Sequence, residues 1–346
     1  MTKEDDLYAR ITNKIIADLE KGELTWRQPW SAEYLAARVM RPLRWQGLPY
    51  TGINTIMLWM TAVEKSYASP YWMTFKQALD LKAHVRKGEK SAPVVYADSI
   101  IREEADADGK AVPHAIHFLK QYAVFNAEQI EGLPETFYNR PEPPPVNAEQ
   151  RIEALERFFR QTKAEITTGT QAAYVLSRDI IEMPPFECFD DAPSYYATLS
   201  HELTHWTRHP SRLAREFNRK TWGDEGYAKE ELVAELGACF LAADLGFEPV
   251  TREDHAAYIQ HWLKVLQNDK RFIFHAAAHA QRAVEYVQGL QEKIPAPGEL
   301  APTRDMNRGA PSSKSASHED EIVIRGIASP PNAPRRRLLK PKGPQR

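Results

Sequence analysis

The stretch Tyr195-Tyr-Ala-Thr-Leu-Ser-His-Glu-Leu-Thr-His-Trp-Thr207 contains two histidines, with a glutamate directly after the first. Its pattern predicts a helix. Residues four positions apart project from one helical face, so the imidazoles of His201 and His205 can reach the same cation. Glu202 lies beside them and would take a proton from water held by that cation. This H-E-x-x-H pattern predicts a divalent-metal centre with a general base.

Such a centre needs a third protein ligand, which a later helix supplies. The segment Tyr227–Ala242 predicts this helix and carries Glu231 and Glu235 one turn apart, among small residues. We expect Glu231 to complete the ligand set and Glu235 to accept the free ring N–H of a ligand histidine. Glu230 is the alternative ligand, because the register is open. The spacing resembles the E-x-x-x-D pattern of thermolysin-like zincins, with glutamate in place of aspartate.

Each half of this predicted centre also has a simpler interpretation. The histidines alone fit the surface of an amphipathic helix, and the glutamates alone fit a solvated face. Their occurrence together, in the expected order along the chain, favours the metal centre. Zinc is the expected cation, and manganese and cobalt suit the same donors. A second histidine pair, His275 and His279, lies among alanines without a general base, so we interpret it as structural or as part of the surface.

Changes in composition divide the chain into two α+β domains and a tail. The proline-rich segment Pro141–Asn147 predicts an extended linker. We expect a small domain over residues 1–140, a helix-rich domain over 148–290, and a disordered tail over 291–346 with a basic end from Arg335 to Arg346.

Hydrophobic periodicity and turn signals predict the elements of both domains. In the first, we expect helices at Asp6–Lys21, Thr51–Ser66 and Thr74–Leu81, and strands at Val94–Tyr96 and Ile116–Phe125 around an Asp-Gly turn. In the second, we expect helices at Ala148–Gln161, Ser194–Thr207, Tyr227–Leu245, Asp254–Asn268 and Phe272–Leu290, and strands at Ala173–Leu176 and Asp179–Met183.

Charge and cysteine content exclude several classes of protein. The 45 basic and 47 acidic residues give a formal net charge of -2, which excludes a uniformly basic nucleic-acid binder. Two cysteines are too few for a disulfide framework and fit a reducing cytoplasm. The amino terminus is acidic, so we expect no secretory signal. The sequence has no apolar run long enough for a membrane helix, so we expect none.

Aromatic residues alternate with Arg, Lys, Gln and Asn before the predicted linker. Single-stranded DNA binding uses such a mixture, because rings stack on bases and cations contact phosphates. Packing of the rings in a core is the alternative, and composition does not decide between them. The candidate DNA-binding residues are Trp26, Trp30, Arg44, Trp45, Tyr50, Asn54, Trp72, Lys76, Arg86, Lys87 and Lys90.

Several of these motifs, in order, resemble the ArdC antirestriction family over about residues 7 to 290. The first domain resembles its single-stranded-DNA-binding domain through the segments 26–30, 50–54, 72–77, 85–90 and 124–134. The second resembles the zincin-type metallopeptidase domain of polyvalent proteins through 195–207, 212–213 and 227–241. Arg208 stands where the family's pattern leads us to expect glycine.

The resemblance implies a protein of conjugative plasmids and related mobile elements. It implies that the chain binds incoming single-stranded DNA without sequence preference and shields it from host restriction, beside a metal-dependent peptidase site. Related N-terminal domains also occur in plasmid primases. Two alternatives stay open: a DNA-binding or interaction module with a purely structural metal site, and an accessory domain of a primase or conjugal transfer protein.

Overall fold

The first part of the chain contains both helices and largely antiparallel strands, as the α+β prediction requires. The computed structural model describes residues 3–24, 26, 40–105, 111–138, 148–218, 224–247 and 255–292. Residues 1–293 form one compact unit and 294–346 a second, and every described residue belongs to the first. The predicted linker, the tip of the Asp-Gly turn and the predicted tail from residue 293 onward lie outside the described residues.

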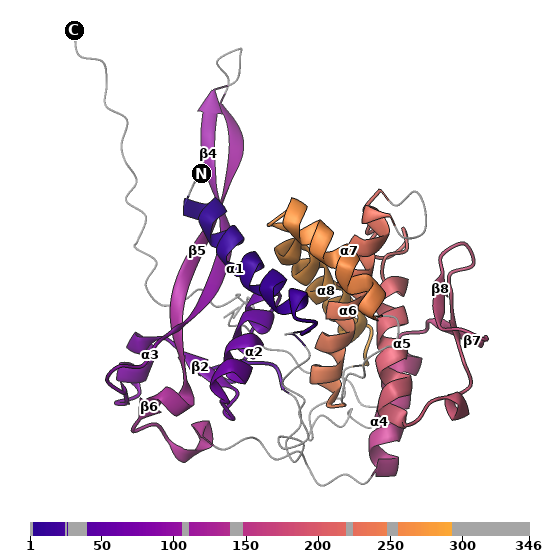
Figure 1. The fold of residues 1–346 in the computed structure, drawn as a ribbon, viewed down its shortest axis with the longest axis horizontal. Coiled ribbons are helices and arrows are strands. Elements are labelled where there is room, and N and C mark those ends of the chain that lie inside the picture. The colour runs from indigo at the N-terminus through magenta and orange to yellow at the C-terminus, as the bar shows by residue number, and fades with distance from the viewer. Residues whose placement is uncertain are drawn as a thin grey trace, which may run out of the picture. The chain divides into compact units, whose positions relative to one another are not determined.

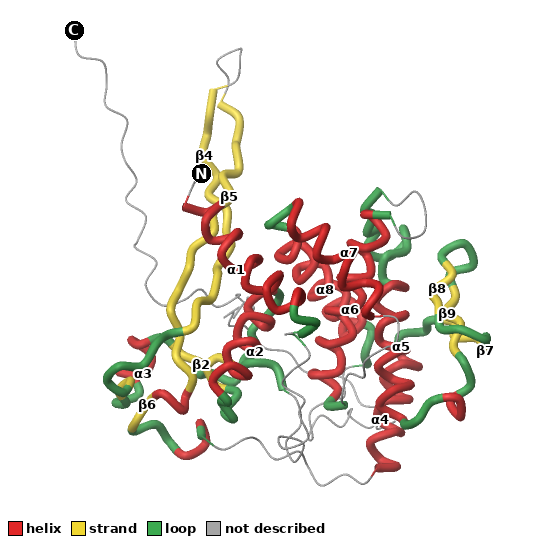
Figure 2. The backbone as a smooth tube through the Cα atoms, in the orientation of Figure 1, coloured by secondary structure: helices red, strands yellow, loops and turns green. Residues whose placement is uncertain are grey.

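The segment before the predicted linker combines three helices with a sheet (Figure 1). The helices are α1 (Lys3–Glu20), α2 (Ile53–Lys65) and α3 (Phe75–Asp80). The four-stranded sheet has the order β1 (Leu43–Arg44), β2 (Tyr71–Met73), β5 (Ala111–Asn126) and β4 (Ala92–Ala105). Strands β3 (His84–Val85) and β6 (Ile130–Glu131) form a separate pair. The long antiparallel ribbon of β4 and β5 stands out in Figure 2.

The segment after the predicted linker is dominated by helices. These are α4 (Ala148–Gln161), α5 (Ala192–Trp206), α6 (Glu225–Leu245), α7 (His255–Asn268) and α8 (Phe272–Gly289). A small sheet has the order β7 (Glu165–Thr168), β9 (Ile180–Met183) and β8 (Ala173–Val175). Helix α6 packs against both α5 and α8 (Figure 1). The predicted fold class and all eight predicted helices are therefore confirmed, whereas the short strands β1, β2, β3, β6 and β7 were missed.

Local sequence explains where the important helices begin and end. Asp191 caps α5 by accepting a hydrogen bond from the Ser194 backbone N–H at 2.8 Å. Asp224 caps α6 in the same way through the Tyr227 N–H at 2.7 Å, and Gly246 ends α6 in the left-handed region. Thr74 caps α3 as predicted. Among the described residues, no helix is both long and apolar enough to cross a membrane.

The largest hydrophobic core draws on segments from both sides of the predicted linker. Leu7 and Ile15 of α1 and Trp59 of α2 belong to the same cluster as side chains of α5 to α8. Trp26 packs against Trp262 of α7 with ring centroids 6.1 Å apart. The boundaries predicted at residues 140 and 148 therefore do not divide this core, and they stay a prediction about the chain's organisation.

Candidate metal centre

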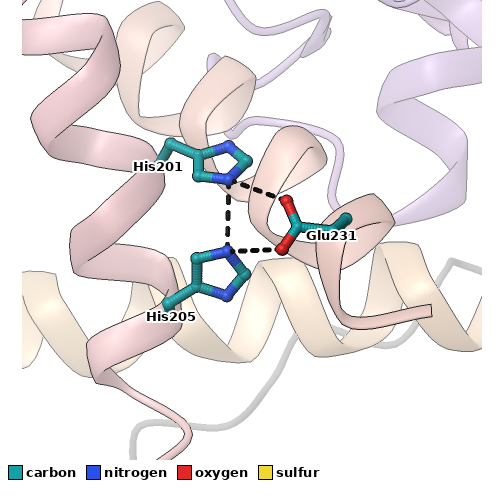
Figure 3. A group of neighbouring side chains, drawn as sticks. All are labelled: His201, His205 and Glu231. Atoms are coloured by element: carbon teal, nitrogen blue, oxygen red, sulfur yellow. Dashed lines mark hydrogen bonds and ion pairs between the residues drawn. The ribbon is translucent and has the colours of Figure 1, made fainter. Parts of the chain in front are cut away.

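Helix α5 places the two motif histidines as the sequence predicts. His201 and His205 lie one turn apart and are 5% and 8% exposed. Their Nε2 atoms face each other at 3.2 Å (Figure 3). Because both rings are buried, their packing holds the two Nε2 atoms in place on either side of one position.

Helix α6 brings a carboxylate to the same position. Glu231 Oε2 lies 3.3 Å from His201 Nε2, and Glu231 Oε1 lies 3.4 Å from His205 Nε2 (Figure 3). The helices approach closely because Gly237 faces Thr204: a Cβ at Gly237 would lie 2.5 Å from Thr204 Cγ2. Among the described residues, the structure thus brings together His201, His205 and Glu231 as a group that could hold a metal ion.

The spacing of these donor atoms fits a tetrahedral divalent cation. With metal–ligand bonds of about 2.0–2.1 Å, two ligands of a tetrahedron are roughly 3.3 Å apart. The three separations above lie within about 0.1 Å of that value, with a different oxygen of Glu231 facing each histidine. Two imidazoles and one carboxylate are also the donor set of catalytic zinc sites, which keep a fourth position open. The site is therefore built for a divalent metal ion.

A buried ion pair between Glu230 and Arg215 orients the His205 ring through its Nδ1 atom. Its Nδ1 lies 3.0 Å from Glu230 Oε1, and because a carboxylate only accepts, Nδ1 carries the hydrogen. Arg215, whose side chain is 1% exposed, donates to both oxygens of Glu230 at 2.7 and 2.8 Å. From the sequence, Glu235 was expected to accept the free ring N–H of a ligand histidine. In the structure Glu230 makes this contact with His205, while Glu235 is buried near Cys239, with Oε1 4.0 Å from its Sγ.

The electrostatics of the site favour a cation. Burial on its own lowers the pKa of His205, but Glu231 and Glu230 outweigh it and raise that pKa to about 10. Burial opposes ionisation of Glu231 as well, yet His205 and His201 hold its pKa well below the usual range. Glu231 is therefore ionised at neutral pH and directs its charge at the space between the rings.

Glu202 is anchored to the neighbouring sheet. It is 3% exposed, and its Oε2 accepts a hydrogen bond from the Tyr174 backbone N–H of β8 at 2.8 Å. The Tyr174 hydroxyl in turn donates to Asp179 Oδ1 at 2.8 Å, and Arg212 contacts both groups. Arg212 also lies over the Trp206 ring, 3.8 Å from its centroid. The proposed general base is thus fixed by a network from β8 to the end of α5.

Sequence reasoning missed two residues beside the metal ligands. Tyr227 lies one turn before Glu231, and burial, followed by the charge of Glu231, raises the pKa of its phenol. The i,i+4 spacing to Glu231 was a signal that could have identified Tyr227. Arg215 lies in the irregular segment after α5, where no periodic pattern marks it. Only the folded chain brings its guanidinium to Glu230.

The candidate DNA-binding rings fall mostly in the core. Trp26, Tyr50 and Trp72 are 0%, 8% and 1% exposed, so no base can stack on their faces in this structure. Trp45 is half-buried and packs against a smaller cluster around Met73. Trp30 lies outside the described residues. The three buried rings therefore pack in the core and offer no face to a base.

The polar candidates divide into structural and exposed residues. Asn54 hydrogen-bonds both backbone groups of Val95 on β4, at 2.7 and 2.8 Å, so its amide is already engaged. Arg44 lies 5.5 Å from the Tyr50 ring centroid. Arg86 pairs with Glu89 at 2.7 Å. Lys76, Lys87 and Lys90 are exposed and, with Arg86, stay the predicted cationic contacts.

Two family models match the chain, on either side of the predicted linker. Residues 5–125 match the N-terminal domain of the anti-restriction factor ArdC. Residues 153–279 match a zincin-like metallopeptidase, and this range contains all three candidate metal ligands.

Curated relatives match over most of the chain. It is 37% identical to the uncharacterized protein y4eC of Sinorhizobium fredii strain NGR234, over 83% of this chain and 92% of that protein. It is 36% identical to two proteins named DNA primase TraC from Escherichia coli, of which it spans only 27% and 20%.

Two solved structures share both the fold and much of the sequence. The metal-free crystal structure of the antirestriction protein ArdC from plasmid R388 is 45% identical, with a TM-score of 0.69, over 82% of this chain and 97% of that one. The Mn(II)-bound structure of the same protein is 44% identical, with a TM-score of 0.67 and the same coverage. The chain belongs to the ArdC family of antirestriction proteins.

Proposed function

We propose that this protein binds single-stranded DNA without sequence preference and protects incoming DNA from host restriction. The support is its membership of the ArdC family over both matched segments. The exposed cations Lys76, Lys87 and Lys90 would contact phosphates. Location in the cytoplasm, expected from the cysteine content, and the domain boundaries stay predictions.

We further propose that the second matched segment is a metal-dependent peptidase, with zinc as the first choice of cation. The observation that carries this proposal is the close grouping of the His201, His205 and Glu231 donor atoms. Glu202 lies on α5, the helix that carries the two histidines. When bound, the cation supplies Lewis acidity, which polarises a carbonyl and makes water more acidic. Glu202 acts as the general base, held in place by the Tyr174 N–H.

One observation favours a second function for the same site. Glu202 also links α5 to β8, so it has a structural role even without chemistry. The rival interpretation is a structural metal site within a DNA-binding or interaction module, including the primase-associated arrangement of the TraC relatives.

The substitution Glu202→Gln separates the two interpretations. The amide oxygen of glutamine can still accept the Tyr174 N–H, whereas it cannot serve as a base. In a screen of unfolded protein substrates with zinc-loaded protein, we expect cleavage by the wild type and its loss in this variant, with unchanged metal content. If the wild type cleaves nothing, or Glu202→Gln cleaves as well as the wild type, the peptidase proposal is wrong.

The DNA proposal is tested by titrating the full chain with fluorescent single-stranded and duplex oligonucleotides at two salt concentrations. We expect preferential binding of the single strand that weakens as salt rises. Equal or absent binding of the two forms would refute this part of the proposed function.

A further inference from the structure

Two exposed tyrosines lie next to each other on the β4–β5 ribbon. Tyr96 and Tyr122 are 37% and 38% exposed. Their ring centroids are 6.5 Å apart and their planes are inclined at 73°. Neither tyrosine was among the DNA-binding residues predicted from the sequence. Adjacent aromatic rings that are exposed to solvent often mark a binding surface.

The strand register shows that both rings belong to one face of the ribbon. Val94 pairs with Tyr122, and Tyr96 pairs with Lys120, and directly paired residues share a face. Val94 faces a small core cluster with Tyr50 and Trp72. The same face therefore runs from that buried cluster to the exposed group Tyr96, Lys120 and Tyr122, which we call the tyrosine platform.

The platform carries one cation. Lys120 is exposed; it lies directly opposite Tyr96 and two residues before Tyr122 on the same strand. Exposed ring faces beside cations suit a chain of bases linked by phosphates. A purely apolar partner would instead leave Lys120 desolvated.

We propose that the tyrosine platform is the base-stacking surface for single-stranded DNA. This inference rests on the proposed function. It supplies exposed ring faces for stacking, which the buried rings of Trp26, Tyr50 and Trp72 cannot offer. Successive bases stack on Tyr96 and Tyr122 while Lys120 contacts the phosphate backbone. Because every base has a face to stack and no base edge is read, the surface binds without sequence preference.

A protein strand added to the sheet is the main rival occupant, because β4 is an edge strand. At Val95, however, the Asn54 amide already binds the outward N–H and C=O of this edge. At this position the backbone of β4 is therefore not available to pair with an added strand. A partner would instead contact the side chains on the face of the ribbon.

The test compares variants of the full chain in binding a fluorescent oligothymidylate at two salt concentrations. Stacking is worth about 1–3 kcal/mol per base, so we expect Tyr96→Ala and Tyr122→Ala each to weaken binding about tenfold. The corresponding phenylalanine variants retain a stacking face and should bind within about twofold of the wild type. Lys120→Gln should weaken binding and reduce its dependence on salt.

Phe186→Ala is the matched control, because it removes a ring of similar exposure, 41%, far from the ribbon in sequence. We expect it to bind DNA as the wild type does. A second measurement uses the wild type alone: photo-crosslinking to an oligonucleotide with 5-iodouracil should mark the peptides that contain Tyr96 or Tyr122. It remains informative even if an alanine variant fails to fold.

The outcomes distinguish this inference from the proposed function. The wild type could bind single-stranded DNA while the variant with both Tyr96→Ala and Tyr122→Ala binds equally well, or the crosslinks could fall elsewhere. Either result would refute the tyrosine platform as the stacking surface and leave the proposed function intact. If the double variant changes only the oligomeric state, the surface contacts protein instead. If the wild type binds no single-stranded DNA, both proposals fail.

Discussion

At the scale of single residues, the metal site depends on two adjacent glutamates with different tasks. Glu231 directs both oxygens at the histidine Nε2 atoms, whereas Glu230 holds His205 from its other nitrogen. Successive helical residues point about 100° apart, which explains how neighbours can serve opposite sides of one imidazole. Arg215 compensates the buried charge of Glu230 and keeps that carboxylate ionised, with a pKa of about 2 despite burial.

The contact between Glu230 and His205 leads to a prediction about metal affinity. Substituting Glu230→Gln weakens the hydrogen bond that orients the ring, and loss of such partners typically lowers metal affinity about 10- to 100-fold. Competition with a chelating dye measures this change in variants whose folding is verified by circular dichroism. Glu225→Gln, at the exposed start of the same helix, is the control and should bind as the wild type does. Equal affinity in both variants would contradict the role of Glu230.

His279 gives a prediction about pH. Burial lowers its pKa to about 4, and the charges of Arg282 and Arg215 act in the same direction. An unfolded histidine has a pKa of about 6.5, so the unfolded chain binds more protons between these values. The stability that neutral His279 contributes is therefore complete above pH ~6.5 and is lost as the pH falls toward 4.

Urea unfolding of the wild type and of His279→Gln at pH 7.5 and 5.0 measures this contribution. Because the ring is partly exposed, we expect the stability difference between the two proteins to shrink by only about 1 kcal/mol at the lower pH. A difference that is the same at both pH values would show that His279 does not titrate in this way.

At the scale of elements, the site depends on the close approach of α5 and α6. Gly237→Ala adds a methyl group that would lie 2.5 Å from Thr204 Cγ2, between the two ligand histidines in sequence. Alanine gains about 1 kcal/mol in helix propensity, but overpacking costs typically 1–3 kcal/mol and separates the helices. We expect lower stability and weaker metal binding, measured by thermal unfolding with and without zinc.

Gly289→Ala is the control for this prediction, because no atom lies within 4 Å of the added Cβ at the end of α8. It should leave metal binding unchanged. If Gly237→Ala matches Gly289→Ala in both stability and metal affinity, the helices are not held as closely as described.

Long helices could be predicted from the sequence because their apolar residues recur over several turns, as in α4, whose predicted bounds match the structure. Strands of two or three residues, such as β1 and β2, carry no comparable period. The predicted metal ligands lie on two such helices, so their spacing predicted His201, His205 and Glu231, with Glu230 as the alternative to Glu231. The partner of His205 could not be identified in this way, because it depends on how α6 is rotated against α5 and on Arg215 from an irregular segment.

At the scale of the whole molecule, segments on both sides of the predicted linker share one core, and a buried arginine joins them. Arg41, 5% exposed, donates to Asp244 of α6 at 2.9 and 3.1 Å and to Gln281 of α8 at 3.0 Å. Its guanidinium also lies 4.2 Å from the Phe240 ring centroid. The described residues should therefore unfold in one cooperative transition.

Arg41→Met tests this connection. It leaves the partly buried Asp244 without its main cation, so we expect a loss of about 2–3 kcal/mol in the free energy of unfolding. Lys21→Met is the control, because the Lys21 side chain is 61% exposed and its ion pair with Asp18 should contribute less than about 0.5 kcal/mol. Equal stability of the two variants in urea unfolding would argue against a shared core.

The central claim is that His201, His205 and Glu231 bind one divalent cation. The most direct measurement is the zinc stoichiometry and affinity of the wild type, Glu231→Gln and Glu235→Gln by isothermal titration calorimetry. All three proteins keep a buried polar side chain at each position, so packing is matched. We predict one zinc ion per chain in the wild type and in Glu235→Gln, and a loss of affinity of at least about 100-fold in Glu231→Gln. A wild type that binds no zinc, or a Glu231→Gln variant that binds it as tightly as the wild type, would contradict the account.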